Sequence, residues 1–100
     1  MIKAYKVSNN SFAMKACEKL AKDRFYAPTA EKMLGIINFC LDLQLGFDGS
    51  SFYIVVSAAE EKLNHFKHQN LQEIDLRSLN KVTFIEGIGT PGLLTYVRSL

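Results

Sequence analysis

The six residues Ser51-Phe52-Tyr53-Ile54-Val55-Val56 form the most strand-like segment of the chain. Aromatic and β-branched side chains are enriched in strands because they pack well on a pleated surface. The turn cluster Phe47-Asp48-Gly49-Ser50 precedes this segment, and Ser57-Ala58-Ala59-Glu60 follows it. The latter matches a capping box, in which the Ser and Glu side chains satisfy backbone N–H groups of a first helical turn. The sequence therefore predicts a strand over 51–56 and a helix from Ala58 to about His68.

The N-terminal segment predicts another strand and another helix. Residues 2–7 alternate apolar with charged side chains, which is the period of a strand with one buried face. Residues 8–11 then offer short polar side chains that cap a helix. We expect the helix to run from Ser11 to about Phe25, with one apolar face made by Ala13, Ala16, Cys17, Leu20 and Ala21.

Residues 28–46 predict a second helix, which begins near Pro28 and ends at Gly46. Its apolar residues spread over roughly 200° of the circumference, a wider arc than one sheet face covers. One interpretation is a central core helix. The other is an interface with a second copy or a protein partner, since two-fold dimers are the commonest oligomers. The candidate interface residues are Met33, Ile36, Phe39 and Leu43.

The C-terminal third predicts a short strand or edge segment at 72–76, a turn at 78–80 and a strand at 81–86. A glycine-rich loop over 87–92 follows, and then a terminal helix or hairpin arm over 93–100, of which we favour the helix. The predicted order is β-α-α-β-α-(β)-β-α. This is one small α+β domain over residues 1–100, with a three- to four-stranded sheet covered by helices.

Composition places the chain among ordinary globular proteins. It has 100 residues, of which 48% are hydrophobic and 22% charged, and a net charge of +2. The positive charge is concentrated in the first third.

The two cysteines, Cys17 and Cys40, are too far apart for a disulfide scaffold or a CxxC motif, so we expect both to be reduced core residues. The sequence shows neither a secretory signal nor a membrane span, which predicts a cytoplasmic protein.

The glycines at 87–92 are the sharpest motif match. Gly87-x-Gly89-x-x-Gly92 follows a predicted strand, as in dinucleotide-binding folds, but a further strand and an acidic residue would have to follow it. What remains is a loop whose N–H groups bind one phosphate or carboxylate. The residues would be Gly87, Gly89, Thr90 and Gly92. The alternative, which we favour, is an ordinary turn before the terminal element.

Three lysines of the first helix suggest a different anion site. Lys15, Lys19 and Lys22 share its polar face, with Phe25 and Tyr26 close by as stacking platforms. Positive grooves with aromatic side chains bind single-stranded nucleic acid. The low total charge makes nucleic acid the less favoured partner, because exposed lysines are also ordinary on an amphipathic helix.

No set of residues predicts catalysis or a metal centre. Glu61, His65 and His68 fall on one side of the helix predicted at 58–68, but metal sites need three or four well-placed ligands, and exposed histidines are more often solvated. Cysteines on apolar helix faces are inert. We therefore expect no catalytic residue, no metal and no cofactor.

The function predicted from the sequence is a non-enzymatic interaction module that self-associates. The alternative is a protein that binds an anionic ligand at the three lysines or at the glycine loop.

Overall fold

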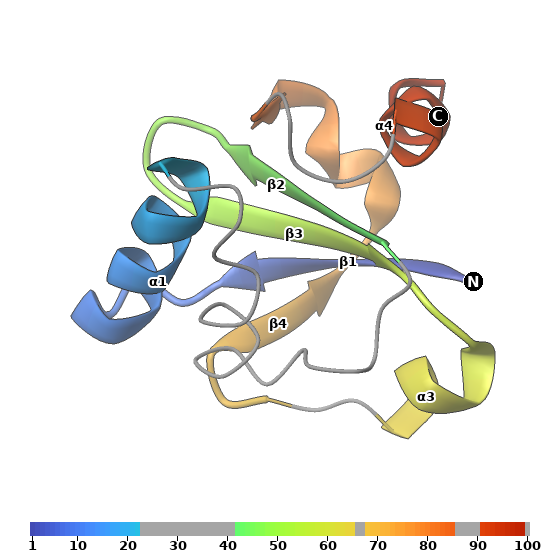
Figure 1. Cartoon of the computed structure of the whole chain (residues 1–100), viewed down its shortest axis with the longest axis horizontal. Helices are drawn as coiled ribbons and strands as arrows, with labels where there is room; N and C mark the ends of the chain where they lie inside the picture. The colour runs from blue at the N-terminus through green and yellow to red at the C-terminus, as the bar shows by residue number, and fades with distance from the viewer. Residues whose placement is uncertain (23–41, 66–67, 86–90, 100) are drawn as a thin grey trace.

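Five strands of the described residues form one sheet at the centre of the molecule (Figure 1). The computed structural model describes residues 1–22, 42–65, 68–85 and 91–99. The elements are β1 (Ile2–Val7), α1 (Ser11–Lys22), β2 (Asp42–Phe47), β3 (Phe52–Ser57), α3 (Glu60–His65), β4 (Leu71–Ile74), the 3-10 helix η1 (Leu76–Lys81), β5 (Thr83–Phe84) and α4 (Pro91–Arg98). The predicted α+β class is confirmed, and the sheet is wider than the three or four strands expected.

The strand predicted at 51–56 is β3, the middle strand of the sheet. The strand order is β4-β1-β3-β2-β5, and each neighbouring pair is antiparallel. Ile54 lies opposite Tyr5 of β1 on one side and opposite Leu45 of β2 on the other. A continuous apolar run suits this place, because both faces of a middle strand are covered.

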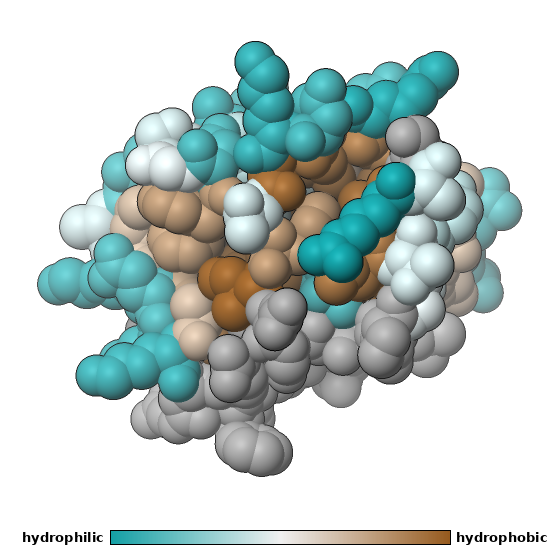
Figure 2. Space-filling view, turned by 90° about the horizontal axis from the view of Figure 1, so that it is seen from above, coloured by the Kyte–Doolittle hydropathy of each residue, from teal (hydrophilic) through white to brown (hydrophobic). Residues whose placement is uncertain are grey.

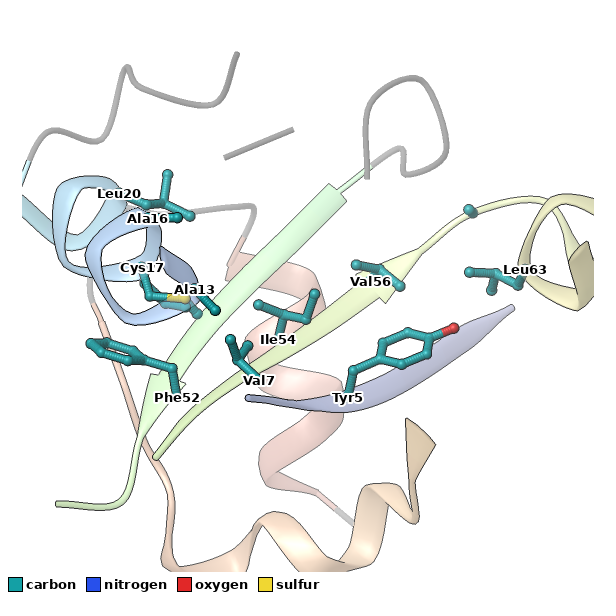
Figure 3. Packing of buried hydrophobic residues seen from close by; sticks show 12 residues of the cluster. Tyr5, Val7, Ala13, Ala16, Cys17, Leu20, Phe52, Ile54, Val56 and Leu63 are labelled. Atoms are coloured by element: carbon teal, nitrogen blue, oxygen red, sulfur yellow. The ribbon is translucent and has the colours of Figure 1, made fainter. Parts of the chain in front are cut away.

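Two hydrophobic clusters lie on opposite faces of the sheet. The first joins α1 and Leu63 of α3 to the sheet, and Figure 3 shows the α1 side chains pointing toward Val7, Ile54 and Phe52. The second joins Ala4 and Val55 to η1, β5 and α4. Alternate residues of β1 and β3 therefore enter different clusters, as the two-residue period of a strand requires. The sheet lies between α1 and α3 on one face and η1 and α4 on the other.

The predicted helix over 28–46 is wrong at its C-terminal end, where β2 begins at Asp42. Leu43, Leu45 and Phe47 alternate with Gln44 and Gly46, and pairing with β3 along the whole of β2 favours this strand period over the helical one. Gly46 is therefore no helix stop but a residue inside a strand. Residues 28–41 of the prediction lie outside the described residues.

Gly46 is required by close packing. A Cβ atom at this position would collide with the Val82 side chain and approach the Phe84 ring to 3.3 Å. Gly46 lies opposite Phe84 in the register between β2 and β5. A glycine inside a strand commonly marks such a close approach.

The first and last helices agree with the predictions. α1 begins at Ser11, and Asn10 caps it by accepting the Ala13 N–H at 2.8 Å. α4 confirms the helix favoured for the C-terminal segment, although it begins at Pro91. α3 begins at Glu60 and not at Ala58, because Ser57 continues β3 and pairs with Ile2 and Asp42.

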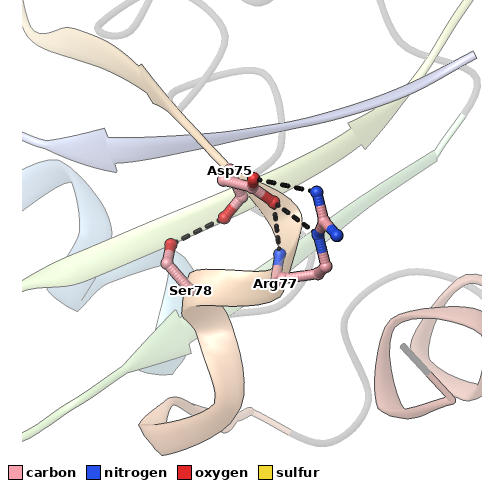
Figure 4. A network of polar contacts seen from close by, with 3 residues as sticks. All are labelled: Asp75, Arg77 and Ser78. Atoms are coloured by element: carbon pink, nitrogen blue, oxygen red, sulfur yellow. Dashed lines mark hydrogen bonds and ion pairs between the residues drawn. The ribbon is translucent and has the colours of Figure 1, made fainter.

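The segment after β4 differs from the predicted turn at 78–80. β4 confirms the short strand expected near 72–76, and η1 then replaces the turn. Asp75 caps η1 by accepting the Arg77 N–H at 2.9 Å, and its carbonyl accepts the Ser78 hydroxyl at 2.6 Å (Figure 4). The Arg77 N–H above all, and then the Arg77 side chain, lower the pKa of the Asp75 carboxyl group. The strand predicted at 81–86 shortens to β5 because η1 extends to Lys81.

Candidate functional site

The three lysines predicted to bind an anion lie together on the surface of α1. Lys15, Lys19 and Lys22 are all exposed, and the opposite side of α1 packs on the sheet. Lys19 and Lys22 belong to the last turn, where positive charge interacts favourably with the helix dipole. The structure therefore confirms that they share one exposed face of α1.

Phe12 extends this face with an exposed aromatic ring. Its exposure is 51%, which is high for a large apolar residue. At 3.6 residues per turn, positions 12, 15, 19 and 22 fall within about 80° of the helix circumference and extend over about 15 Å. We call Phe12, Lys15, Lys19 and Lys22 the α1 stripe. The spacing of Phe12 from Lys15 was a signal for it in the sequence, whereas Phe25 and Tyr26 lie outside the described residues.

A groove of about 710 Å³ begins where the α1 stripe ends. It lies between the last turn of α1, the turn that joins β2 to β3, and β5, and Lys22 belongs to both features. We call it the edge groove, because β5 is the outermost described strand on that side of the sheet. Its lining residues are Glu18, Ala21, Lys22, Phe47, Asp48, Gly49, Phe52, Lys81, Thr83 and Ile85.

The edge groove has an apolar floor and a charged rim. The rings of Phe47 and Phe52 pack against each other with their centroids 4.7 Å apart. Figure 2 shows apolar residues gathered over this side of the molecule, with hydrophilic side chains around them. Two lysines and two carboxylates line the groove, so its charge is balanced.

Asp48 at the rim is held by the turn to which it belongs. Its Oδ1 accepts the N–H groups of Ser50 and Ser51 at 2.9 and 2.8 Å, and its Oδ2 accepts the Tyr53 hydroxyl at 2.7 Å. These bonds, with the Ser51 N–H first, hold the pKa of Asp48 well below its usual range. Gly49 supplies the positive φ of 101° that the turn needs. The carboxylate therefore shapes the wall of the groove and stays charged.

The chemistry-bearing residues singled out in the sequence are not brought together. Cys17 is fully buried in the first cluster and unpaired to another cysteine, which confirms it as a reduced core residue. Burial, with a smaller contribution from Glu18, raises the pKa of its thiol to about 12. Cys40 lies outside the described residues. α3 ends at His65, and His68 lies beyond it with Nδ1 accepting the Asn70 N–H at 3.1 Å, so the predicted alignment of Glu61, His65 and His68 on one helix is wrong. Within the described parts of the chain, no group of three metal-ligating side chains is close enough to hold an ion.

The other predicted sites fall mostly outside the described residues. Gly87, Gly89 and Thr90 are among them, and Gly92 is an exposed residue in the first turn of α4. Of the predicted interface residues, Met33, Ile36 and Phe39 also lie outside. Leu43 is wrong as an outer helix residue: it belongs to β2, is half-buried against the first cluster and lies opposite Val56.

Comparison with known proteins adds no further assignment. Among the described residues, no helix has the length and apolar character needed to cross a membrane. Searches against protein-family models, curated proteins and solved structures find no match to this chain.

Proposed function

We propose that this protein is a non-enzymatic interaction module that self-associates through the edge groove. The observation that carries the proposal is the apolar floor of this groove at the outermost described strand, β5. Phe47 and Ile85 of the floor are only half-buried, and apolar patches that stay in contact with solvent mark interaction surfaces. Strand edges are templates for pairing with another chain. This location differs from the helix surface expected from the sequence, of which Leu43 faces the core and Met33, Ile36 and Phe39 lie outside the described residues.

The backbone of β5 supports pairing between two copies. The Ile85 N–H donates to the Leu45 carbonyl at 2.9 Å, so Ile85 faces β2. In an antiparallel ladder the backbone N–H and C=O groups of adjacent residues point to opposite sides of the strand. The N–H and C=O of Phe84 therefore point to the outer edge. Two β5 edges related by a two-fold axis would pair antiparallel, with the same surface used on both copies.

The charge of the edge groove also favours a second copy over a polyanion. Each copy offers Lys22 and Lys81 together with Glu18 and Asp48. A two-fold contact can place the lysines of one copy near the carboxylates of the other, whereas a polyanion would meet both carboxylates. Complementary charges of this kind fix the partner and its orientation.

Substituting Thr83→Lys tests the proposed contact. Thr83 is exposed on β5, and a third lysine in each groove brings like charges together across a two-fold contact. We expect the wild-type chain to form dimers at micromolar concentration and the variant to dissociate about tenfold more readily or beyond. Analytical ultracentrifugation measures both, with circular dichroism to show that the variant is folded.

Gln72→Lys is the matched control. Gln72 is exposed on β4, the strand at the opposite edge of the sheet, so the change adds the same charge to an equivalent position. The control should leave the dimer unchanged. A wild-type chain that is monomeric at all accessible concentrations, or a dimer that only Gln72→Lys dissociates, contradicts the proposal.

The second candidate function is binding of single-stranded nucleic acid along the α1 stripe, and the exposure of Phe12 in line with the lysines favours it. A stacking base contributes about 1–3 kcal/mol, and each neutralised phosphate of a single strand adds about 0.7 to the salt dependence of binding. For a random oligonucleotide followed by fluorescence anisotropy, replacing the three lysines by Gln should lower the slope of log K against log salt by about 2.

Phe12→Ala separates stacking from charge in this experiment. It should weaken binding while leaving the salt slope unchanged, and Lys62→Gln on the exposed surface of α3 should change neither. If the wild-type chain does not bind the oligonucleotide at low salt, the α1 stripe is not a nucleic-acid site.

A further inference from the structure

We propose that a third surface, the cavity between η1 and α4, binds a small organic anion that has an apolar body. The cavity has a volume of about 310 Å³, at the lower end of the range for small-molecule sites. This size fits a compact ligand and is too small for a peptide or a nucleic acid. Its lining residues are Leu76, Arg77, Leu79, Asn80, Val82, Phe84, Val97 and Arg98.

The apolar part of the cavity is built from three separate elements. Leu79 of η1, Phe84 of β5 and Val97 of α4 are at most 7% exposed and belong to the second hydrophobic cluster. Side chains in such a cluster are held by their neighbours, so the apolar wall is already formed before a ligand enters. An apolar wall of this kind binds the body of a ligand and leaves its polar group at the mouth.

The polar part of the cavity carries two positive charges. Arg77, Asn80 and Arg98 are exposed and lie around the apolar wall, and no acidic residue is among the described lining residues. Arg77 approaches Asp75 at 3.4 Å, but both side chains are well exposed, at 80% and 60%. Exposed ion pairs of this kind contribute little free energy, so the Arg77 guanidinium can also bind the anionic group of a ligand.

This charge distinguishes the cavity from the edge groove and from a cavity beside α3, both lined by described residues. The edge groove combines two lysines with Glu18 and Asp48. A cavity of about 380 Å³ beside α3 combines Lys3 with Glu73, and these two residues form an ion pair at 3.3 Å. As far as the chain is described, the lining of the η1–α4 cavity is the only one of the three with basic residues and no acidic one. Arg77 also contacts Asp75 outside the lining, so Arg98 is the main charge offered to a ligand. Guanidinium groups recognise carboxylates and phosphates through paired N–H donors, which identifies the ligand class as an anion.

Binding of hexanoate, hexanol and phenyl phosphate tests the inference. Hexanoate should bind saturably and shift the backbone amide resonances of Leu79 and Val97 in two-dimensional NMR spectra. Hexanol has the same chain without the charge, and we expect it to bind about tenfold more weakly or not at all. If phenyl phosphate binds in place of hexanoate, the anion is a phosphate ester and the inference still holds.

Variants at Arg98 locate the charge. Arg98→Gln should weaken binding of the anion about tenfold, Arg98→Lys should restore part of it, and Lys62→Gln on α3 is the control that should leave it unchanged. Three outcomes would overturn the inference. Hexanol and hexanoate bind equally well, the Arg98 variants bind the anion as tightly as the wild type, or none of the three probes binds. Because Thr83→Lys leaves all the lining residues of this cavity in place, these results are separate from the test of self-association.

Discussion

Replacing Ile54 with Ala should lower the free energy of unfolding by about 2–5 kcal/mol, the usual cost of truncating a large aliphatic side chain in a core. Ile54 is fully buried in the middle of the sheet, opposite Tyr5 on one side and Leu45 on the other. Its side chain fills the space beneath α1 (Figure 3), so the neighbouring strands cannot close the gap without leaving their register. A domain of this size has about 5–15 kcal/mol of stability in total, so the loss is a large fraction of it.

Urea unfolding measures this effect, and two variants control it. Ile54→Val removes one methylene group and should cost about 0.5–1.5 kcal/mol. Tyr96→Ala truncates a side chain that is 45% exposed and should change stability by less than about 0.5 kcal/mol. If Ile54→Ala costs no more than Tyr96→Ala, Ile54 is not at the centre of the core.

Gly46→Ala should destabilise the protein by about 1–3 kcal/mol, although it adds only one methyl group. The new Cβ would collide with Val82 and press on the Phe84 ring, and both residues belong to the segment that forms the edge of the sheet. The cost should therefore appear as a weakened contact between β2 and β5. Unfolding in urea gives its size, and hydrogen exchange at the Ile85 amide, which bonds to Leu45, shows whether the edge loosens first.

A double-mutant cycle shows whether the collision is the cause. Val82→Ala removes the atom that the new Cβ would meet, so Gly46→Ala should cost clearly less in the Val82→Ala background than in the wild type. Equal costs in both backgrounds would mean that the loss comes from elsewhere, for example from the backbone conformation of Gly46.

The elements that the sequence predicts correctly are those with strong local signals. The β-branched run of β3 and the three-to-four spacing of α1 each carry their own evidence. β1 was predicted correctly as a strand, but the single buried face expected for it is wrong, since Ala4 and Tyr5 are buried on opposite faces of the sheet. β2 was missed because Leu43 to Phe47 follow a longer apolar segment that also fits a helical period. Only the pairing with β3 decides between a helix and a strand for these residues. η1 was missed because its N-cap, Asp75, falls inside the segment predicted as a short strand at 72–76.

The candidate sites divide in the same way. The lysines of the α1 stripe lie on one helix, so their spacing alone places them together, and the same spacing would have found Phe12. The edge groove and the η1–α4 cavity each combine side chains from segments far apart in the chain. No local period contains that information, because it depends on the order of strands in the sheet.

The strand order also has a consequence for how the chain assembles. β1 is synthesised before both of its partners, β3 and β4, which come from later parts of the chain. Of the described strand pairs, the hairpin of β2 and β3 closes the shortest loop, and the Asp48 turn favours its closure. Pairing between distant segments is slow, because the entropy of closing a long loop is lost before the contacts form. The ribosome must therefore release the chain as far as β4 before β1 has both of its partners. Until then the charges of Lys3 and Lys6 help to keep this partly apolar strand in solution.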